Sequence, residues 1–112
     1  MFVTAISVVE VLTLPGHSEE VASNLSRLAH HSRTISGCLD AAVICSFANP
    51  LLWILSIFWE CETAMQSYFL SAPEEPIADL LTKRLIKSIT FKSFIDSLNR
   101  PSFCRHSMSA IG

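Results

Sequence analysis

The sequence has little charge and little glycine. Of its 112 residues only 16% are charged and 3 are glycine, whereas 50% are hydrophobic. Average chains carry about 25% charged residues. With a net charge of −2 the chain lacks the basic excess of nucleic-acid-binding proteins, so we expect no nucleic-acid partner. It also has no glycine-rich, phosphate-binding loop. A short, apolar, single-domain chain indicates a large buried interface.

The four cysteines form no metal-binding motif. Cys38, Cys45, Cys61 and Cys104 include no CxxC pair, and no histidine stands at zinc-finger spacing from them. We therefore predict no bound metal, and reduced thiols in a cytoplasmic protein. No apolar run reaches the roughly 18 residues that a membrane span needs, and no basic segment precedes an apolar run at the amino terminus. Neither a membrane partner nor a signal peptide is expected.

Hydrophobic periodicity divides the chain into strands and helices. The β-branched residues 2–12 predict a strand. Residues 18–32 predict a helix, because Val21, Leu25 and Leu28 recur on one stripe and Ser18 can serve as the N-cap. The other predicted segments are strands over 39–47 and 51–59 joined by a tight turn, helices over 63–71 and about 75–85, and a strand over 86–95.

The strand over 51–59, LLWILSIFW, is apolar on both faces. Because successive side chains point to opposite faces, Trp53, Leu55, Ile57 and Trp59 share one face, and the residues between them share the other. A strand of this kind must be covered on both sides. The helices of a short chain can cover one face of the sheet. We expect a second copy of the chain to cover the other.

The element order is therefore βαββαβ, which is typical of the ferredoxin-like α+β fold. This fold is a four-stranded antiparallel sheet with its helices on one face. We predict one domain over residues 1–97 and an extended tail over 98–112. Since the second sheet face stays bare and apolar, a back-to-back homodimer is expected.

Four short motifs stand in order between residues 2 and 95, each at a strand or helix boundary. They are Leu14-Pro15-Gly16 before an acidic helix start, Ser36-Gly37-Cys38-Leu39, Phe58-Trp59-Glu60, and Glu62-Thr63-Ala64-Met65. Together they resemble the antibiotic biosynthesis monooxygenase superfamily of dimeric α+β barrels. That superfamily includes cofactor-independent oxygenases of polyketide and quinol rings, haem-degrading oxygenases, and small proteins without established catalysis.

The resemblance implies a substrate pocket between the helices and the sheet. Trp59 stands at the family's tryptophan, and Tyr68 stands where many members have a histidine. Leu55 replaces an asparagine of the polyketide oxygenases. The haem-degrading branch has its proximal histidine near the position of Ala78, where this sequence has none. The resemblance thus implies neither haem nor another cofactor.

Three residues are candidate catalytic groups. Tyr68 could donate a hydrogen bond to a substrate carbonyl or phenolate, or could be a half-buried amphipathic tyrosine. His30 and His31 end a predicted helix. Neighbours on a helix lie about 100° apart, so the two cannot chelate one metal. One of them could face the pocket as an acid or base. Alternatively, both could stand there because a cation near the C-terminus of a helix interacts favourably with the helix dipole.

Three residues are candidate substrate contacts. Trp59 could form a flat wall for an aromatic substrate, or could be a core or rim residue. Trp53 begins the same strand and could contact substrate, the core or a partner chain. Leu55 falls at a family substrate position.

Three hypotheses follow. The first is a cofactor-independent monooxygenase-like protein acting on a bulky aromatic or quinone-like intermediate of secondary metabolism. The second is a non-catalytic, chaperone-like protein that holds an apolar biosynthetic intermediate, and the replacement of the usual histidine by Tyr68 favours it somewhat. The third is a structural dimer without a small ligand. Whether the chain is an enzyme therefore stays open at this point.

Overall fold

A computed structural model describes residues 3–71 and 74–96 of the chain. This part contains the elements expected from the sequence, in the expected order. They are β1 (Ala5–Thr13), α1 (Ser18–Ser32), β2 (Cys38–Cys45), β3 (Leu52–Trp59), α2 (Glu62–Ser71), α3 (Glu74–Thr82) and β4 (Ile86–Ile95). The predicted tail over 98–112 lies outside the described residues.

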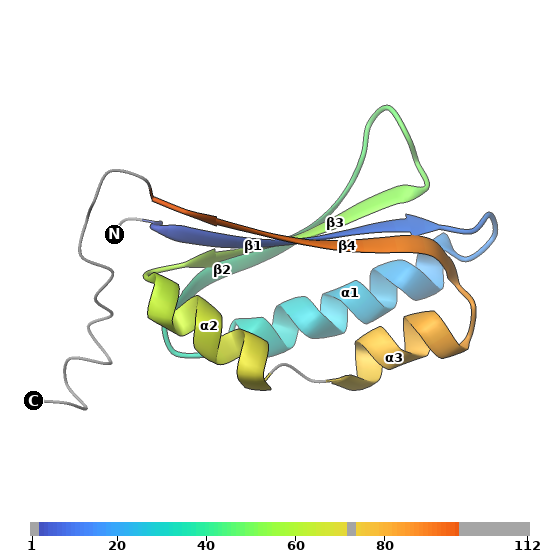
Figure 1. Ribbon diagram of the computed structural model, residues 1–112. Helices are drawn as coiled ribbons and strands as arrows, with labels where there is room; N and C mark the ends of the chain where they lie inside the picture. Colours follow the sequence, from blue (N-terminus) through green and yellow to red (C-terminus); the bar gives the residue numbers. More distant parts are fainter. Residues whose placement is uncertain (1–2, 72–73, 97–112) are drawn as a thin grey trace, which may run out of the picture.

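The strands form one antiparallel sheet in the order β2-β3-β1-β4. All three helices lie against the same face of this sheet, and no helix of the described residues covers the opposite face (Figure 1). The ferredoxin-like α+β fold predicted from the sequence is confirmed. The second helical connection of the βαββαβ pattern is divided into α2 and α3, as the proline-containing interruption indicates.

Two local predictions are wrong. Helix α1 has His17 rather than Ser18 as its N-cap, and no side chain caps it. The Ser18 hydroxyl instead lies 3.5 Å from the hydroxyl of Thr13 at the end of β1. Strand β2 ends at Cys45, two residues early, because the turn to β3 starts at Ser46, whose hydroxyl accepts a hydrogen bond from the amide of Asn49 at 3.2 Å.

The core lies between the helices and one sheet face. Every second residue of β1 from Ala5 to Thr13 is buried, which matches the two-residue period of a strand. Strand β3 contributes Leu55, Ile57 and Trp59 to the same layer. Helix α1 covers them with a stripe at helical spacing. The stripe consists of Val21, Leu25, Leu28 and Ala29.

The opposite sheet face is mostly apolar. Ile54 lies on it, because its register partner in β1 is Glu10. Glu10 is paired there with Lys92 of β4, whose Nζ lies 3.2 Å from the carboxylate. The neighbouring side chains of this face are only partly covered in a single chain. They include Ile6, Val8, Leu12 and Phe58.

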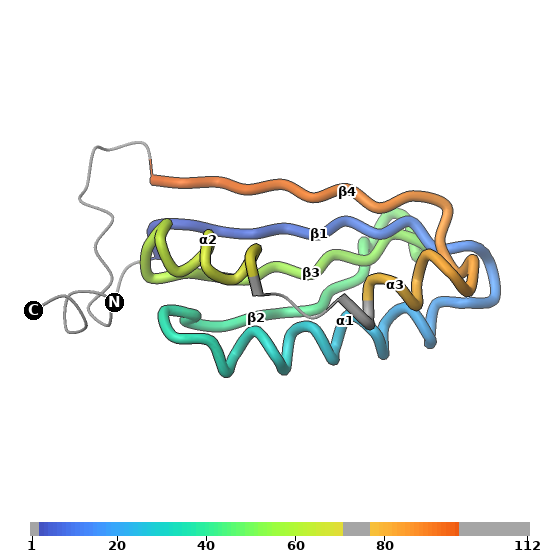
Figure 2. Tube along the Cα trace, turned by 60° about the horizontal axis from the view of Figure 1, so that its bottom comes forward, coloured from blue at the N-terminus to red at the C-terminus, as the bar shows by residue number. Residues whose placement is uncertain are grey.

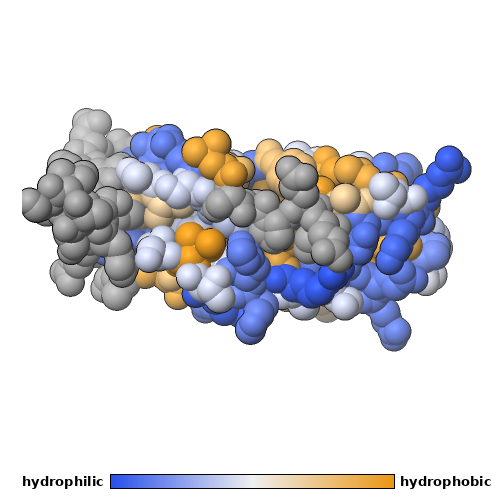
Figure 3. Space-filling model, turned by 90° about the horizontal axis from the view of Figure 1, so that it is seen from below, coloured by the Kyte–Doolittle hydropathy of each residue, from blue (hydrophilic) through white to orange (hydrophobic). Residues whose placement is uncertain are grey.

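Strand β4 is the least covered strand of the sheet. In Figure 2, α1 runs along β2 and α2 crosses β1 and β3, whereas β4 lies at the edge of the sheet, to one side of these helices. Phe91 and Ile95 of β4 share the helix side with Val9 and Ala5, yet they are 59% and 55% exposed. Seen from the helix side, apolar surface gathers in patches along one long edge (Figure 3). The helix layer therefore leaves the sheet open at β4.

Helix α3 is attached chiefly to α1. The carboxylate of its Asp79 forms ion pairs with Arg27 of α1 at 3.3 Å and with Lys83 at 3.8 Å. Exposed pairs of this kind contribute about 0–1 kcal/mol each. Leu80, which is fully buried, anchors α3 more strongly. No helix within the described ranges is long and apolar enough to cross a membrane.

We expect the bare sheet face to form a homodimer interface of roughly 2,000 Å² or more. Ile54→Glu should then give a monomer at micromolar concentration, because it places a second carboxylate opposite Glu10 on a mostly apolar face. Light scattering coupled to size exclusion measures the mass. Ser26→Lys, on the exposed side of α1, is the control and should remain dimeric. A monomeric mass for the unaltered chain would contradict the dimer.

Candidate functional site

A pocket of about 160 Å³ lies between the helices and the β1–β4 side of the sheet. All three helices and two strands contribute to it. Its lining residues are Ser7, Val8, Val9, Leu28, Tyr68, Phe69, Ile77, Phe91 and Lys92. The pocket therefore lies between the helices and the sheet, where the family resemblance places a substrate, and it opens where β4 lacks helical cover.

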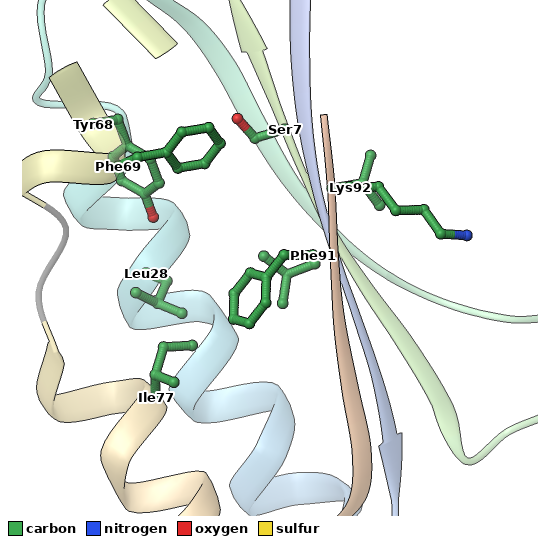
Figure 4. A pocket seen from close by; sticks show the side chains of 9 residues that line it. Ser7, Leu28, Tyr68, Phe69, Ile77, Phe91 and Lys92 are labelled. Atoms are coloured by element: carbon green, nitrogen blue, oxygen red, sulfur yellow. The ribbon is translucent and has the colours of Figure 1, made fainter. Parts of the chain in front are cut away.

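The side chains that face the pocket are mainly apolar. In Figure 4 the ring of Phe91 reaches across toward Leu28 of α1 and Ile77 of α3, and Phe69 closes the end near Ser7. Lys92 points away, toward the other sheet face, where it pairs with Glu10. Its charge is therefore absent from the pocket. Apolar walls with few polar groups are typical of sites for small apolar ligands.

Trp59 lies behind the pocket lining. The side chain is fully buried. Its indole Nε1 donates a hydrogen bond of 2.8 Å to the hydroxyl of Ser7, and its ring packs on Tyr68 with centroids 5.3 Å apart at 44°. The tryptophan thus supports two lining residues instead of presenting its own face to a ligand.

Tyr68 lines the pocket but is 6% exposed. Burial raises the pKa of its phenol. A hydrogen bond with Ser32 lowers this pKa, and the nearby Cys38 thiol raises it further. Burial outweighs the hydrogen bond with Ser32, which favours the ionised phenol. Tyr68 is therefore neutral near pH 7 and unsuited to act as a base.

The other predicted site residues do not line this pocket. His30 is exposed at the end of α1, and His31 is partly buried, with an Nε2 atom that has no partner among the described residues. Leu55 is fully buried in the core layer. Trp53 is partly buried at the start of β3, and its Nε1 atom likewise lacks a partner within the described chain. Of the predicted residues, the structure brings Tyr68 to the pocket and Trp59 directly behind it.

Ser7 is the lining residue that the sequence analysis missed. It is 2% exposed on the helix side of β1. A signal was present, because Ser7 interrupts the apolar residues at the inward positions of an otherwise β-branched strand. A buried hydroxyl on a core face needs a hydrogen-bond partner, and so indicates a polar site.

Metal ligands and thiols add nothing to this site. Residues 3–71 and 74–96 contain no group of three or more His, Cys, Asp or Glu side chains that could hold a metal ion. Cys38 and Cys45 are free thiols. Burial raises the pKa of Cys38 above its usual value. Cys61 is disulfide-bonded, so the prediction that all four cysteines are reduced is wrong.

The chain belongs to the antibiotic biosynthesis monooxygenase family, whose model matches residues 4–73. This match extends from just before β1 to just beyond α2, and so includes Trp59 and Tyr68. It confirms the resemblance drawn from the four motifs. No curated protein sequence matches the chain.

Solved structures of low sequence identity share the fold. A candidate antibiotic biosynthesis monooxygenase from Deinococcus radiodurans is 20% identical with a TM-score of 0.72, over 88% of this chain and 98% of that one. A conserved protein from Methanosarcina mazei Go1 is 22% identical with a TM-score of 0.69, over 85% and 95%. A second candidate monooxygenase, from Nitrosomonas europaea, is 10% identical with a TM-score of 0.68, over 90% and 99%. At these identities the likeness establishes the fold alone.

The raised pKa of Tyr68 can be measured directly, because the chain has a single tyrosine. Titration of the phenolate absorbance in the near ultraviolet should give a midpoint above 10 for the folded protein and about 10 in urea. A folded-state midpoint at or below the value in urea would show that the phenol is not desolvated.

The same shift links stability to pH. A pKa that is raised in the folded state favours the neutral phenol, so its contribution is complete below about pH 10 and is lost as the pH rises through the folded pKa. The free energy of unfolding, measured with urea, should therefore fall above pH 10 in the unaltered chain. Tyr68→Phe should remove that part of the decline, whereas Cys38→Ser should remove only the part contributed by the thiol, whose pKa is also raised.

Proposed function

We propose that the protein binds a neutral aromatic or quinone-like molecule of secondary metabolism in this pocket and acts on it as a cofactor-independent monooxygenase. The observation that carries the proposal is the pocket itself. In a chain of the monooxygenase family, aromatic and aliphatic side chains enclose about 160 Å³ between helices and sheet, and none of the described lining residues turns a charged side chain into it.

In such a reaction the reduced substrate ring itself supplies the electrons to dioxygen. Conversion of a ring methylene to a carbonyl consumes one dioxygen, places one of its oxygen atoms on the carbon, and releases the other as water. The protein need only bind, orient and desolvate the ring. Phe91, Leu28 and Ile77 would exclude water from the ring, and neutral Tyr68 would pack at the other end of the pocket.

A second candidate function is a non-catalytic protein that holds an apolar biosynthetic intermediate. One observation favours it: among the candidate acids and bases, only Tyr68 lines the pocket, and its phenol is neutral. His30 is exposed elsewhere, and His31 is not a lining residue. A binding protein needs the apolar walls but no proton-transfer group. The two functions therefore share a site and differ only in turnover.

The homodimer and the cytoplasmic location belong to this proposal. The partly covered apolar face opposite the helices supports the dimer. The disulfide at Cys61 removes the argument for the cytoplasm that rested on reduced thiols, since disulfides persist mainly in oxidising compartments.

Oxygen uptake in air with anthrone as the substrate separates these functions. The unaltered chain should consume dioxygen with anthrone above the rate of buffer alone. Phe91→Ala should lower this rate and weaken binding about tenfold, because it removes an aromatic wall. Phe47→Ala is the matched control, since Phe47 is fully exposed in the turn between β2 and β3, and it should leave both unchanged.

Each outcome has a defined meaning. Saturable binding of anthrone without oxygen uptake, lost in Phe91→Ala, would replace the oxygenase by the holding protein. The absence of binding, or an equal effect of both substitutions, would contradict a ligand site in this pocket. Equilibrium dialysis measures the binding and an oxygen electrode measures the uptake.

A further inference from the structure

Ser7 presents a neutral hydroxyl at the lining of the pocket. Of the other described polar lining side chains, Lys92 points to the far sheet face, and the phenol of Tyr68 has a hydrogen bond with Ser32. The Ser7 oxygen is directed from β1 toward the end of the pocket near Phe69 (Figure 4). Ser7 is therefore a candidate for a specific polar contact with a bound molecule.

The hydrogen bond from Trp59 occupies the oxygen of the Ser7 hydroxyl but not its proton. The Nε1–H of Trp59 donates to the Ser7 oxygen at 2.8 Å, and the two side chains are 0% and 2% exposed. A hydroxyl has one donor and two acceptor lone pairs. The indole uses one lone pair, and within the described residues no acceptor takes the Ser7 proton. A buried O–H without an acceptor is unfavourable, so a ligand acceptor would gain by filling this place.

The charges around the pocket restrict that acceptor. The cation among the described lining residues, Lys92, is paired with Glu10 on the opposite face at 3.2 Å. A carboxylate or phosphate in the pocket would lose its hydration without gaining an opposite charge, which is strongly unfavourable. A neutral carbonyl needs only one donor. The chemistry thus favours a ketone or quinone oxygen on an otherwise apolar ring.

We infer that Ser7, held in place by Trp59, binds the carbonyl oxygen of a neutral aromatic ketone or quinone and thereby sets its orientation in the pocket. The carbonyl end would lie near Phe69, and the apolar end would lie between Phe91 and Ile77. This inference rests on the proposed function, because it names the polar feature of the molecule that the pocket takes. It requires no catalysis and applies equally to an oxygenase and to a holding protein.

Two ligands that differ only in the carbonyl test the inference. α-Tetralone and tetralin share a bicyclic skeleton, and their dissociation constants are measured by equilibrium dialysis. The unaltered chain should bind the ketone more tightly than the hydrocarbon by about tenfold, the usual range for one neutral hydrogen bond. Ser7→Ala should abolish this preference by weakening the ketone alone. Phe47→Ala should leave the preference unchanged.

Ser7→Cys is a second variant, which keeps the test available if Ser7→Ala does not fold. The thiol is close in size, is a weak acceptor for the Trp59 indole and is a weak donor. It should retain the fold, as circular dichroism will show, and reduce the ketone preference. An undiminished preference in a folded Ser7 variant would overturn the role of Ser7 and leave the pocket intact. An equal loss of both ligands would also overturn it, because Ser7 would then support the pocket without contacting the carbonyl. If neither ligand binds the unaltered chain, the proposed function falls together with the inference.

Discussion

The hydrogen bond from the Trp59 indole to the Ser7 hydroxyl is the interaction on which the site depends. It joins the end of β3 to β1 near its start, inside the layer that the helices cover. An indole of this size, when fully buried, is stable only if its N–H finds an acceptor. The same indole packs on Tyr68 and so fixes α2 against the sheet. Ser7, Tyr68 and the pocket between them thus take their positions from one buried side chain.

This arrangement changes the interpretation of the family tryptophan. From the sequence, Trp59 could be a wall for substrate or a core residue. The structure places it in the core, one layer behind the lining, with Tyr68 and Ser7 between it and the pocket. The aromatic contacts available to a ligand are Phe69 and Phe91, which are 49% and 59% exposed. Both lie at the side where β4 has no helical cover.

The fold could be predicted from the sequence because each element has a strong local period. The two-residue alternation of β1 and the Val21, Leu25 and Leu28 stripe of α1 each permit one structure, and the resulting βαββαβ order permits few topologies. The N-cap of α1 could not be predicted in this way. Ser18 is a favourable cap by type, but the turn before the helix directs its hydroxyl to Thr13.

The site was less predictable, because it depends on side-chain directions that no period encodes. Tyr68 was found through its position after the family tryptophan. Ser7 was missed, although a serine among inward-facing apolar residues of β1 is a visible exception. One of the two histidines was expected to face the pocket, because the end of α1 lies near it in this fold. Neither lines it: His30 is exposed, and His31 is partly buried outside the lining.

The unfolding free energy of Trp59→Phe, compared with that of Trp53→Phe, tests the central claim that Trp59 is a structural support. Both substitutions shorten an aromatic side chain, but only Trp59 donates a hydrogen bond from its indole in the described structure. Urea denaturation should show that Trp59→Phe loses about 1–3 kcal/mol more than Trp53→Phe, the cost of leaving a buried hydrogen-bond partner unsatisfied. Equal stability of the two variants, with ligand binding lost only in Trp59→Phe, would instead make Trp59 a wall of the binding site.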